Sequence, residues 1–323
     1  MSIGKLLPQL AKTAGRSIFG RIFYSPHWRI GWRFATDEDV WSRGNLGGQP
    51  WNTLPNLPFR FFADPFPTVW QGQTWLFFED FDHRRGKGQI SAMEFGAGGP
   101  AGEVMSILRE PWHLSFPYIF EWEETLWMLP ESSENKAVSL YRADRFPFRW
   151  VKELDLIIDI EASDSIIVRF NDRLWLFTTV PSGARDVSDS LHLFHAKSLF
   201  GPWLPHARNP VLIDGASARS AGPAVLRNGT LWRVVQDCER RYGAALGLAK
   251  VTRIDEEGFE QKVERVIKPD HHWPGWRLHT LSRAGALECI DGSAIRLRRA
   301  ELTNSRSDSK EHRARTPSDI AKS

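Results

Sequence analysis

Short runs of apolar residues, each broken by a pair of polar residues, recur along most of the chain. Residues 64–79, 116–131 and 164–179 align without a gap, and each carries a tryptophan at the same position. A fourth copy, residues 221–237, aligns on its own tryptophan, and a weaker fifth copy covers residues 278–292. Recurrence at about 50-residue intervals indicates one structural unit repeated along the chain.

Each copy has the pattern of a β-hairpin. An apolar strand precedes the polar pair, and a second strand with alternating apolar and polar residues follows it. The pairs are Gln71-Gly72, Glu123-Glu124, Asn171-Asp172, Asn228-Gly229 and Ala284-Gly285. Asn-Gly is a strong signal for a two-residue hairpin turn, and we predict turns at all five places.

Two further similar segments extend the hairpins toward four strands. Residues 140–150 and 193–203 both read as a third strand followed by a turn that ends in tryptophan, and another apolar run follows, as at residues 154–160. Four short strands in about 50 residues are typical of a propeller blade, and five blades need about 250 residues. We therefore predict an all-β, five-bladed β-propeller over residues 28–300, with the aligned tryptophans as core anchors between blades.

The two ends of the chain differ from the repeat. Residues 1–27 are basic, and their apolar residues recur every three to four positions, which predicts a short amphipathic helix. Its apolar face either packs on the propeller or makes a peripheral contact with an anionic membrane surface. Charges interrupt the unbroken apolar run that a secretory signal needs, so we expect a cytoplasmic protein. Residues 301–323 are polar and charged, which predicts a disordered tail.

The composition is that of an ordinary globular protein with many aromatic residues. Hydrophobic residues make up 41% of the chain and charged residues 25%; the formal net charge is +3, with 15 Trp, 20 Phe and two Cys. Two cysteines cannot form a disulfide framework, and the chain beyond residue 36 is not basic, so we expect no nucleic-acid partner. The tryptophan content fits an aromatic core or an aromatic-lined pocket.

Polar residues that interrupt the repeat are candidates for a functional site. In a propeller the innermost strands begin at one face of the central channel, so residues at the start of each copy converge on the axis. Asp64 and Asp164 begin their copies and Glu131 ends one; we predict these three as catalytic residues. The predicted substrate-binding residues are His113, Arg219, Gln236, Asp237 and His279.

Carboxyl groups in this arrangement suit chemistry on a sugar acetal. One carboxylic acid protonates the leaving oxygen while an ionised carboxylate assists the attack. Arg219 would hold an anionic group, because a guanidinium matches phosphate or carboxylate geometry. In the alternative, Asp64 and Asp164 are turn residues that bind nearby backbone amides. The chain has no HExxH or CxxC motif, and His271-His272 alone is a weak signal, so we expect neither metal nor cofactor.

Several short phrases also resemble a known family. They are FADPFP at 62–67, FPYIFEWEETLWMLPES at 116–132, LFHAKSLFGPW at 193–203, ARSAGP at 218–223, QDC at 236–238 and LHT at 278–280. In this order they resemble the N-terminal domain of plant glucosamine inositolphosphorylceramide transferases and its stand-alone bacterial relatives, over roughly residues 28–295. The resemblance implies a five-bladed fold similar to glycoside hydrolases of the arabinanase and invertase type.

The resemblance places Asp64 where those hydrolases keep their general base. Their acid is a Glu in a later blade; Thr178-Thr179 stand at that place here, which leaves Glu131 as the nearest candidate. For the plant proteins the resemblance implies sugar transfer by a separate C-terminal domain, which we do not expect in this chain.

We therefore predict a carbohydrate-active propeller that binds a saccharide, nucleotide sugar or sugar phosphate in its axial pocket. It would perform glycosyl transfer or cleavage in the assembly of cell-surface glycans or glycolipids. The alternative is a non-catalytic glycan-binding module that serves a partner glycosyltransferase, favoured if Asp64 and Glu131 lie far apart or are capped by backbone amides. A scaffold that uses the outer blade faces is a third interpretation, which predicts a plugged channel and an exposed apolar patch.

Overall fold

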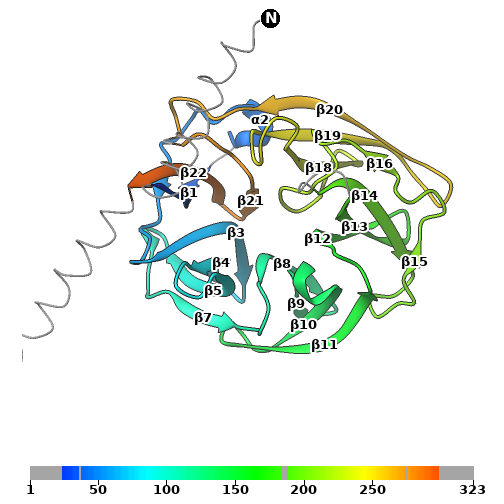
Figure 1. Cartoon of the computed structure of the whole chain (residues 1–323), viewed down its shortest axis with the longest axis horizontal. Coiled ribbons are helices and arrows are strands. Elements are labelled where there is room, and N and C mark those ends of the chain that lie inside the picture. The colour runs from blue at the N-terminus through cyan, green and yellow to red at the C-terminus, as the bar shows by residue number, and fades with distance from the viewer. Residues whose placement is uncertain (1–23, 36–37, 183–187, 274, 298–323) are drawn as a thin grey trace, which may run out of the picture.

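Five antiparallel sheets form a ring around a common axis (Figure 1). The computed structural model describes residues 24–35, 38–182, 188–273 and 275–297. Each sheet holds four or five strands, and within the described residues the helices are the single turns α2 (Val40–Arg43) and η1 (Ser133–Asn135). The prediction of an all-β, five-bladed propeller is confirmed.

The first four blades follow one another along the chain. Blade 1 contains β3 (Arg60–Trp70), β4 (Gln73–Asp82), β5 (Lys87–Gly96), β6 (Gly99–Pro100) and β7 (Met105–Leu108). Blade 2 contains β8 (Ser115–Trp122), β9 (Thr125–Glu131), β10 (Ala137–Arg145) and β11 (Arg149–Ile158). Blade 3 contains β12 (Ser163–Phe170), β13 (Arg173–Pro181), β14 (Ser188–Ala196), β15 (Leu204–Pro205) and β16 (Leu212–Ile213). Blade 4 contains β17 (Val225–Arg227), β18 (Thr230–Asp237), β19 (Ala245–Ile254) and β20 (Phe259–Ile267).

Blade 5 joins the two ends of the described chain. Its strands, in sheet order, are β2 (Asn52–Thr53), β1 (Tyr24–Phe34), β22 (Leu287–Leu297) and β21 (Leu281–Ala284). β1 pairs with β22 from Tyr24↔Leu297 to Phe34↔Leu287, and this long antiparallel pairing closes the ring. This pairing stabilises the fold, because it closes the ring and leaves no gap between blades 1 and 4.

The N-terminal and C-terminal predictions fall mainly outside the described residues. The predicted helix, residues 1–27, overlaps them only where β1 begins at Tyr24, and the predicted disordered tail, residues 301–323, lies wholly outside. Among the described residues, no helix has the length and apolar character needed to cross a bilayer.

The hairpin turns connect the two innermost strands of each blade. In blades 1 to 4 they occupy the predicted residues, and both central residues have positive φ, as the favoured type I′ turn requires. Glu123 and Glu124, for example, have φ of 49° and 58°. The prediction for blade 5 is wrong by one residue: Ala284 belongs to β21, and the turn is formed by residues 285 and 286.

Aromatic packing between blades follows the repeat in most of the ring. The aligned tryptophans of blades 1 to 3 are buried: Trp75, Trp127 and Trp175. In the first two, an aromatic residue from a loop of the next blade packs on the indole: Phe146 on Trp75 at 6.2 Å and Phe200 on Trp127 at 5.4 Å between ring centroids. The prediction of a core anchor is wrong for Trp232 in blade 4, which is only half-buried.

Candidate functional site

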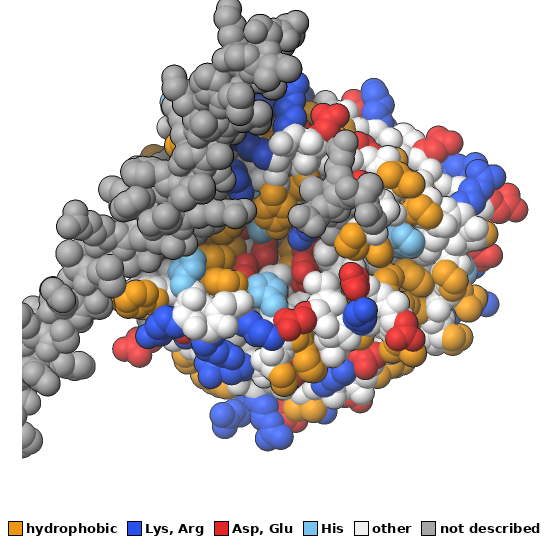
Figure 2. Space-filling model, viewed as in Figure 1, with side chains coloured by type: hydrophobic (Ala, Val, Ile, Leu, Met, Phe, Trp, Pro, Cys, Tyr) orange, Lys and Arg blue, Asp and Glu red, His pale blue; other side chains and the backbone are white. Residues whose placement is uncertain are grey.

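A cavity of about 270 Å³ lies where the innermost strands begin. Its walls are formed by Trp28, Phe61, Ala63, Asp64, Glu79, Phe81, His113, Ser115, Glu131, Arg219, Tyr242 and His279. These residues come from all blades except the third, so the cavity is axial and not confined to one sheet. In the space-filling view, carboxylates and histidines gather around the central hollow of the ring (Figure 2).

The same backbone irregularity occurs at equivalent points of three innermost strands. Asp64, Phe116 and Asp164 have φ of 49°, 43° and 49°, and the register of each hairpin shifts at that residue. A left-handed conformation is unfavourable for residues other than glycine and is kept only when the surrounding structure holds it. The repeat therefore presents Asp, Phe and Asp at equivalent points of blades 1, 2 and 3.

Asp64 is buried and bound by residues of two other blades. One carboxylate oxygen accepts the Thr280 hydroxyl at 2.9 Å, and the other accepts the Phe116 backbone N–H at 3.1 Å. Burial raises the pKa of Asp64 to about 6; the charge of His279 opposes this shift, and the carboxylates of Asp291 and Asp164 add to it. The group therefore titrates close to neutral pH.

His279 lies between a carboxylate and a phenol. Its Nδ1 is 2.8 Å from Oδ2 of Asp291 and its Nε2 is 2.5 Å from the Tyr242 hydroxyl. Burial alone would lower the pKa of His279, but the charges of Asp291 and Asp64 outweigh it and raise the pKa to about 9. A protonated imidazole donates from both nitrogens. The Tyr242 oxygen therefore accepts from His279, and its own O–H is left to donate elsewhere.

Arg219 forms a second buried cluster with Asp164. Its Nε lies 2.6 Å from Oδ2 of Asp164 and its Nη2 lies 3.5 Å from Oε2 of Glu131. The Gln236 amide also donates to Oδ2 of Asp164 at 2.9 Å. Burial raises the pKa of Asp164 to about 7, against the effect of the Arg219 charge. Asp164, itself bound by Gln236, thus holds the guanidinium from behind, while Arg219 and Glu131 form part of the cavity wall.

Glu79 and His113 form a third pair on the wall. The His113 Nδ1 accepts the Gly88 backbone N–H at 2.9 Å, which leaves Nε2 to carry the proton toward Glu79 Oε1, 3.5 Å away. Burial lowers the pKa of His113, in keeping with a neutral ring. Burial also raises the pKa of Glu79 well above its usual range, and the charges of Asp64 and Glu131 add to this shift. Glu79 therefore keeps its proton to a higher pH than an exposed glutamate does.

The structure brings most of the predicted site residues together. Five of them form the wall, namely Asp64, His113, Glu131, Arg219 and His279; Asp164 binds Arg219 from behind, and Gln236 binds Asp164. Asp237 does not line the cavity. Successive side chains of a strand point to opposite faces, and the Asp237 carboxylate instead accepts the Glu239 backbone N–H at 3.1 Å.

Sequence reasoning assigned no role to several residues that complete the site. Glu79 stands at the same strand end as Glu131, so the repeat itself contained its signal. Asp291 lies near the end of the weakest copy of the repeat, and Tyr242 lies between β18 and β19. Trp28, with its ring centroid 4.6 Å from that of His279, comes from β1 and reaches the cavity through ring closure, which no local pattern signals.

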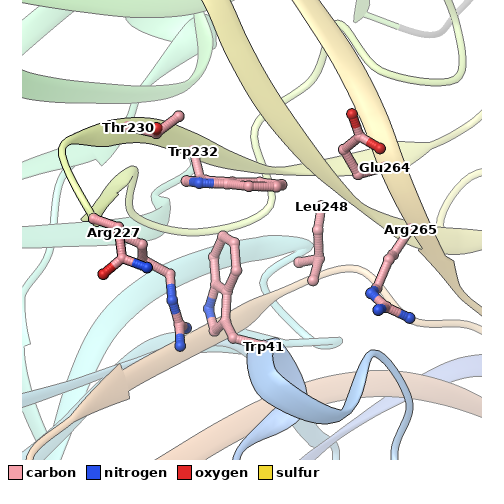
Figure 3. A pocket seen from close by; sticks show the side chains of 8 residues that line it. Trp41, Arg227, Thr230, Trp232, Leu248, Glu264 and Arg265 are labelled. Atoms are coloured by element: carbon pink, nitrogen blue, oxygen red, sulfur yellow. The ribbon is translucent and has the colours of Figure 1, made fainter.

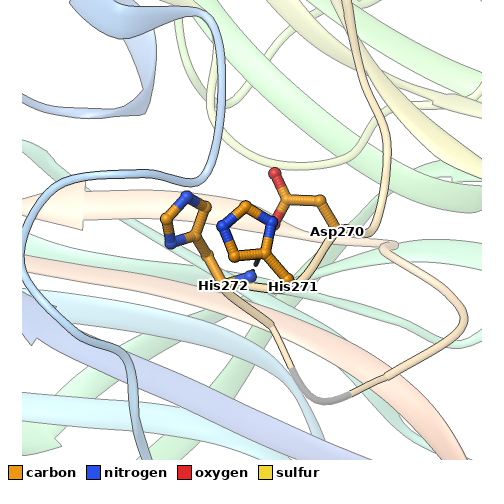
Figure 4. Close-up of side chains that lie close together, drawn as sticks. All are labelled: Asp270, His271 and His272. Carbon is orange, nitrogen blue, oxygen red and sulfur yellow. Dashed lines mark hydrogen bonds between the residues drawn. The ribbon is translucent and has the colours of Figure 1, made fainter.

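Two groups of side chains have metal-ligating atoms close together. Asp64, His279 and Asp291 are buried in the axial site. Since the His279 ring is protonated, a cation there would first have to displace a proton. The other group, Asp270, His271 and His272, is exposed on a loop (Figure 4), where the Asp270 carboxylate also accepts the His272 backbone N–H at 2.8 Å.

Comparison with known proteins gives a family match across the propeller. The family model described as glucosamine inositolphosphorylceramide transferase 1, N-terminal, matches residues 52–289. The glucosamine inositolphosphorylceramide transferase 1 of Arabidopsis thaliana is 34% identical over 258 residues, and that of Oryza sativa subsp. japonica is 32% identical over 258 residues. Each alignment covers 75% of this chain and 34% of the relative, so the chain spans about a third of the length of these curated relatives.

A solved structure shares the fold at low sequence identity. Zg3597, a family 117 glycoside hydrolase from Zobellia galactanivorans, has a TM-score of 0.53 and 12% identity, over 81% of this chain and 80% of that chain. This likeness concerns the fold alone. The family match, in contrast, includes most of the blades and the residues Asp64, Glu79, Glu131 and Arg219 of the cavity wall. The chain therefore belongs to the family of the glucosamine inositolphosphorylceramide transferase 1 N-terminal domain.

Proposed function

We propose that this propeller is carbohydrate-active and that its axial cavity binds a sugar or sugar phosphate for glycosyl transfer or cleavage. The observation that carries the proposal is the pairing of unlike carboxyl groups on one cavity wall. Burial raises the pKa of Glu79 well above its usual range, and it raises the pKa of Asp64 to about 6. Acid and base roles in sugar chemistry need carboxyl groups whose environments separate their pKa values in this way.

Each group takes a definite role in this proposal. Glu79 protonates the leaving oxygen, and Asp64, once ionised, assists the attacking group. Glu131, the acid expected from the sequence, contacts Arg219 and is the alternative proton donor. Arg219 binds an anionic group of the substrate, and Asp164 with Gln236 holds the guanidinium in place.

The relatives support a substrate that combines sugar and phosphate. Their name describes a glucosamine inositolphosphorylceramide transferase, and a phosphate group suits the Arg219 side of the cavity. By this analogy the substrate belongs to cell-surface glycan or glycolipid assembly.

A non-catalytic glycan-binding module is the second candidate, and two observations favour it. The chain matches only a third of the relatives' length, and one oxygen of Asp64 is capped by the Phe116 backbone amide. In that case a partner glycosyltransferase would carry out the chemistry.

The test is turnover of defined sugars by the purified full chain. Nucleotide sugars are supplied with inositol phosphate glycolipid acceptors, or with water alone, and products are measured by mass spectrometry. Asp64→Asn and Glu79→Gln should each lower turnover by about 10²–10⁴-fold. Glu121→Gln, an exposed position on β8, is the matched control. Saccharide binding without turnover by the wild type would establish the binding module instead.

A further inference from the structure

A second pocket lies between blade 4 and the helical turn α2 (Figure 3). It has a volume of about 260 Å³ and is lined by Trp41, Arg227, Asn228, Thr230, Trp232, Leu248, Glu264 and Arg265. Trp232 and Gln236 are four residues apart on β18, which is about 13 Å at the usual rise of a strand. Because Gln236 contacts the axial cluster, the pocket around Trp232 is a separate site.

The pocket exists because blade 5 departs from the repeat. In blades 2 and 3 the loop between the third and fourth strands supplies an aromatic residue that covers the tryptophan of the preceding blade. In blade 5 the corresponding strands are β1 and β2, and the connection between them contains α2. Trp41 of α2 meets Trp232 edge to face, with ring centroids 6.3 Å apart and planes at 87°. Two half-buried indoles therefore form an open corner.

Cationic side chains flank this aromatic corner. The Arg227 guanidinium lies 5.5 Å from the centre of the Trp41 ring, and its side chain is 42% exposed. It lies 3.7 Å from Asp39, but Arg283 holds the same carboxylate oxygen at 2.8 Å. On the other side of the corner stands the exposed Arg265 (Figure 3).

One acidic group also lines the pocket. The Glu264 carboxylate is 3.1 Å from the Lys262 ammonium, so its charge is balanced by a neighbour on the same strand. Two arginines beside one paired glutamate leave the pocket positive.

We propose that this pocket is a second saccharide site, which takes a sugar ring bearing an anionic group. The apolar face of the ring packs against the indoles, and the phosphate or carboxylate binds one of the two flanking guanidiniums, Arg227 or Arg265. A free anion has no apolar face that could pack against the indoles. A neutral sugar has no charge that could bind a guanidinium group. The site does not depend on the chemistry proposed for the axial cavity.

The experiment follows the indole N–H signals of the ¹⁵N-labelled full chain by NMR. Signals of Trp41 and Trp232 are assigned from Trp→Phe variants. Glucose 6-phosphate and glucuronate are titrated, with glucose and inorganic phosphate as references. At least one of the two anionic sugars should shift both signals with an affinity ten or more times that of either reference. No shift of these two signals, or equal affinity for all four compounds, would overturn the proposal.

Variants then assign the anion contact. Arg265→Gln or Arg227→Gln should weaken binding of the anionic sugar about tenfold, and unchanged indole signals of the tryptophans outside the pocket in the free protein show that the fold is intact. Arg149→Gln, at a 69% exposed position on β11, should bind as the wild type does. Asp64→Asn should also leave this binding unchanged, because the axial cavity is a different site. Wild-type affinity in both pocket variants, or an equal loss in Arg149→Gln, would contradict the proposal.

Discussion

The backbone N–H of Asp64 donates to the Asp291 carboxylate over 2.9 Å, and this bond joins the first blade of the ring to the last. The same Asp291 oxygen lies 2.8 Å from Nδ1 of His279. A single buried carboxylate therefore fixes both the strand that carries Asp64 and the imidazole beside it. Ring closure and site geometry depend on the same contacts, which leads to the first prediction.

Removal of His279 should change how stability depends on pH. Its pKa is about 9 in the fold against about 6.5 when exposed, so the protonated ring stabilises the native state. This contribution is complete below about pH 6.5 and is lost as the pH rises through about 9. We expect the free energy of unfolding of His279→Gln to fall below that of the wild type by about 2–3 kcal/mol at pH 6 and by much less at pH 9.

Urea denaturation at several pH values measures this difference. His271→Gln, on the exposed loop, is the control and should follow the wild type at every pH. A difference between His279→Gln and wild type that stays constant from pH 6 to pH 9 would mean that the His279 charge contributes nothing.

Loss of the Arg219 charge should destabilise the fold. Arg219→Met leaves Asp164 buried without its counter-charge, which typically costs about 3–5 kcal/mol. Because the pKa of Asp164 is already raised to about 7, protonation relieves part of this cost, and the loss should be smaller at pH 5 than at pH 8. Adding Asp164→Asn to Arg219→Met should restore stability at pH 8. Thermal unfolding measures this stability. Equal stability of the single and double variants at pH 8 would show that the uncompensated charge of Asp164 is not the cause of the loss.

The parts of this site that sequence reasoning found are those with local signals. Trp75 and Trp127 align because each stands at a fixed distance from a hairpin turn, and the same alignment places Asp64 and Glu131 at strand ends on the axis. Such positions follow from strand alternation and turn geometry alone.

The parts it missed depend on pairing between the two ends of the chain. Trp28 reaches the cavity only because β1 pairs with β22, and Asp291 belongs to that same sheet. Long-range pairing has no local pattern, and Asp291 meets the backbone N–H of Asp64 only where the closed ring brings the last blade beside the first. The half-buried state of Trp232 has the same origin, because the aromatic loop present in blades 2 and 3 is replaced in blade 5 by the connection that carries α2.

The pH profile of turnover should identify the acid and the base. If Asp64 is the base, kcat/KM rises as the pH passes about 6, because Asp64 ionises there. At higher pH kcat/KM falls again, because Glu79 loses its proton. The Glu79→Gln variant should lose the falling limb along with most of its activity. A falling limb that survives in Glu79→Gln but disappears in Glu131→Gln would transfer the acid role to Glu131.

A methyl group at Gly88 should disturb the site through the Glu79–His113 pair. A Cβ at this position would clash with the Leu114 carbonyl oxygen and would lie 2.9 Å from both Glu79 Oε1 and His113 Cε1. The backbone contact cannot move cheaply, so β5 and the loop that carries His113 must separate, and the Gly88 N–H to His113 Nδ1 bond weakens. We expect Gly88→Ala to cost about 1–3 kcal/mol in stability and to lower turnover more than it lowers substrate affinity. Gly98→Ala is the control, because a Cβ there meets nothing within 4 Å. Chemical denaturation and steady-state kinetics of the two variants test this, and a Gly88→Ala protein with wild-type kcat would show that the Glu79–His113 geometry is not needed for catalysis.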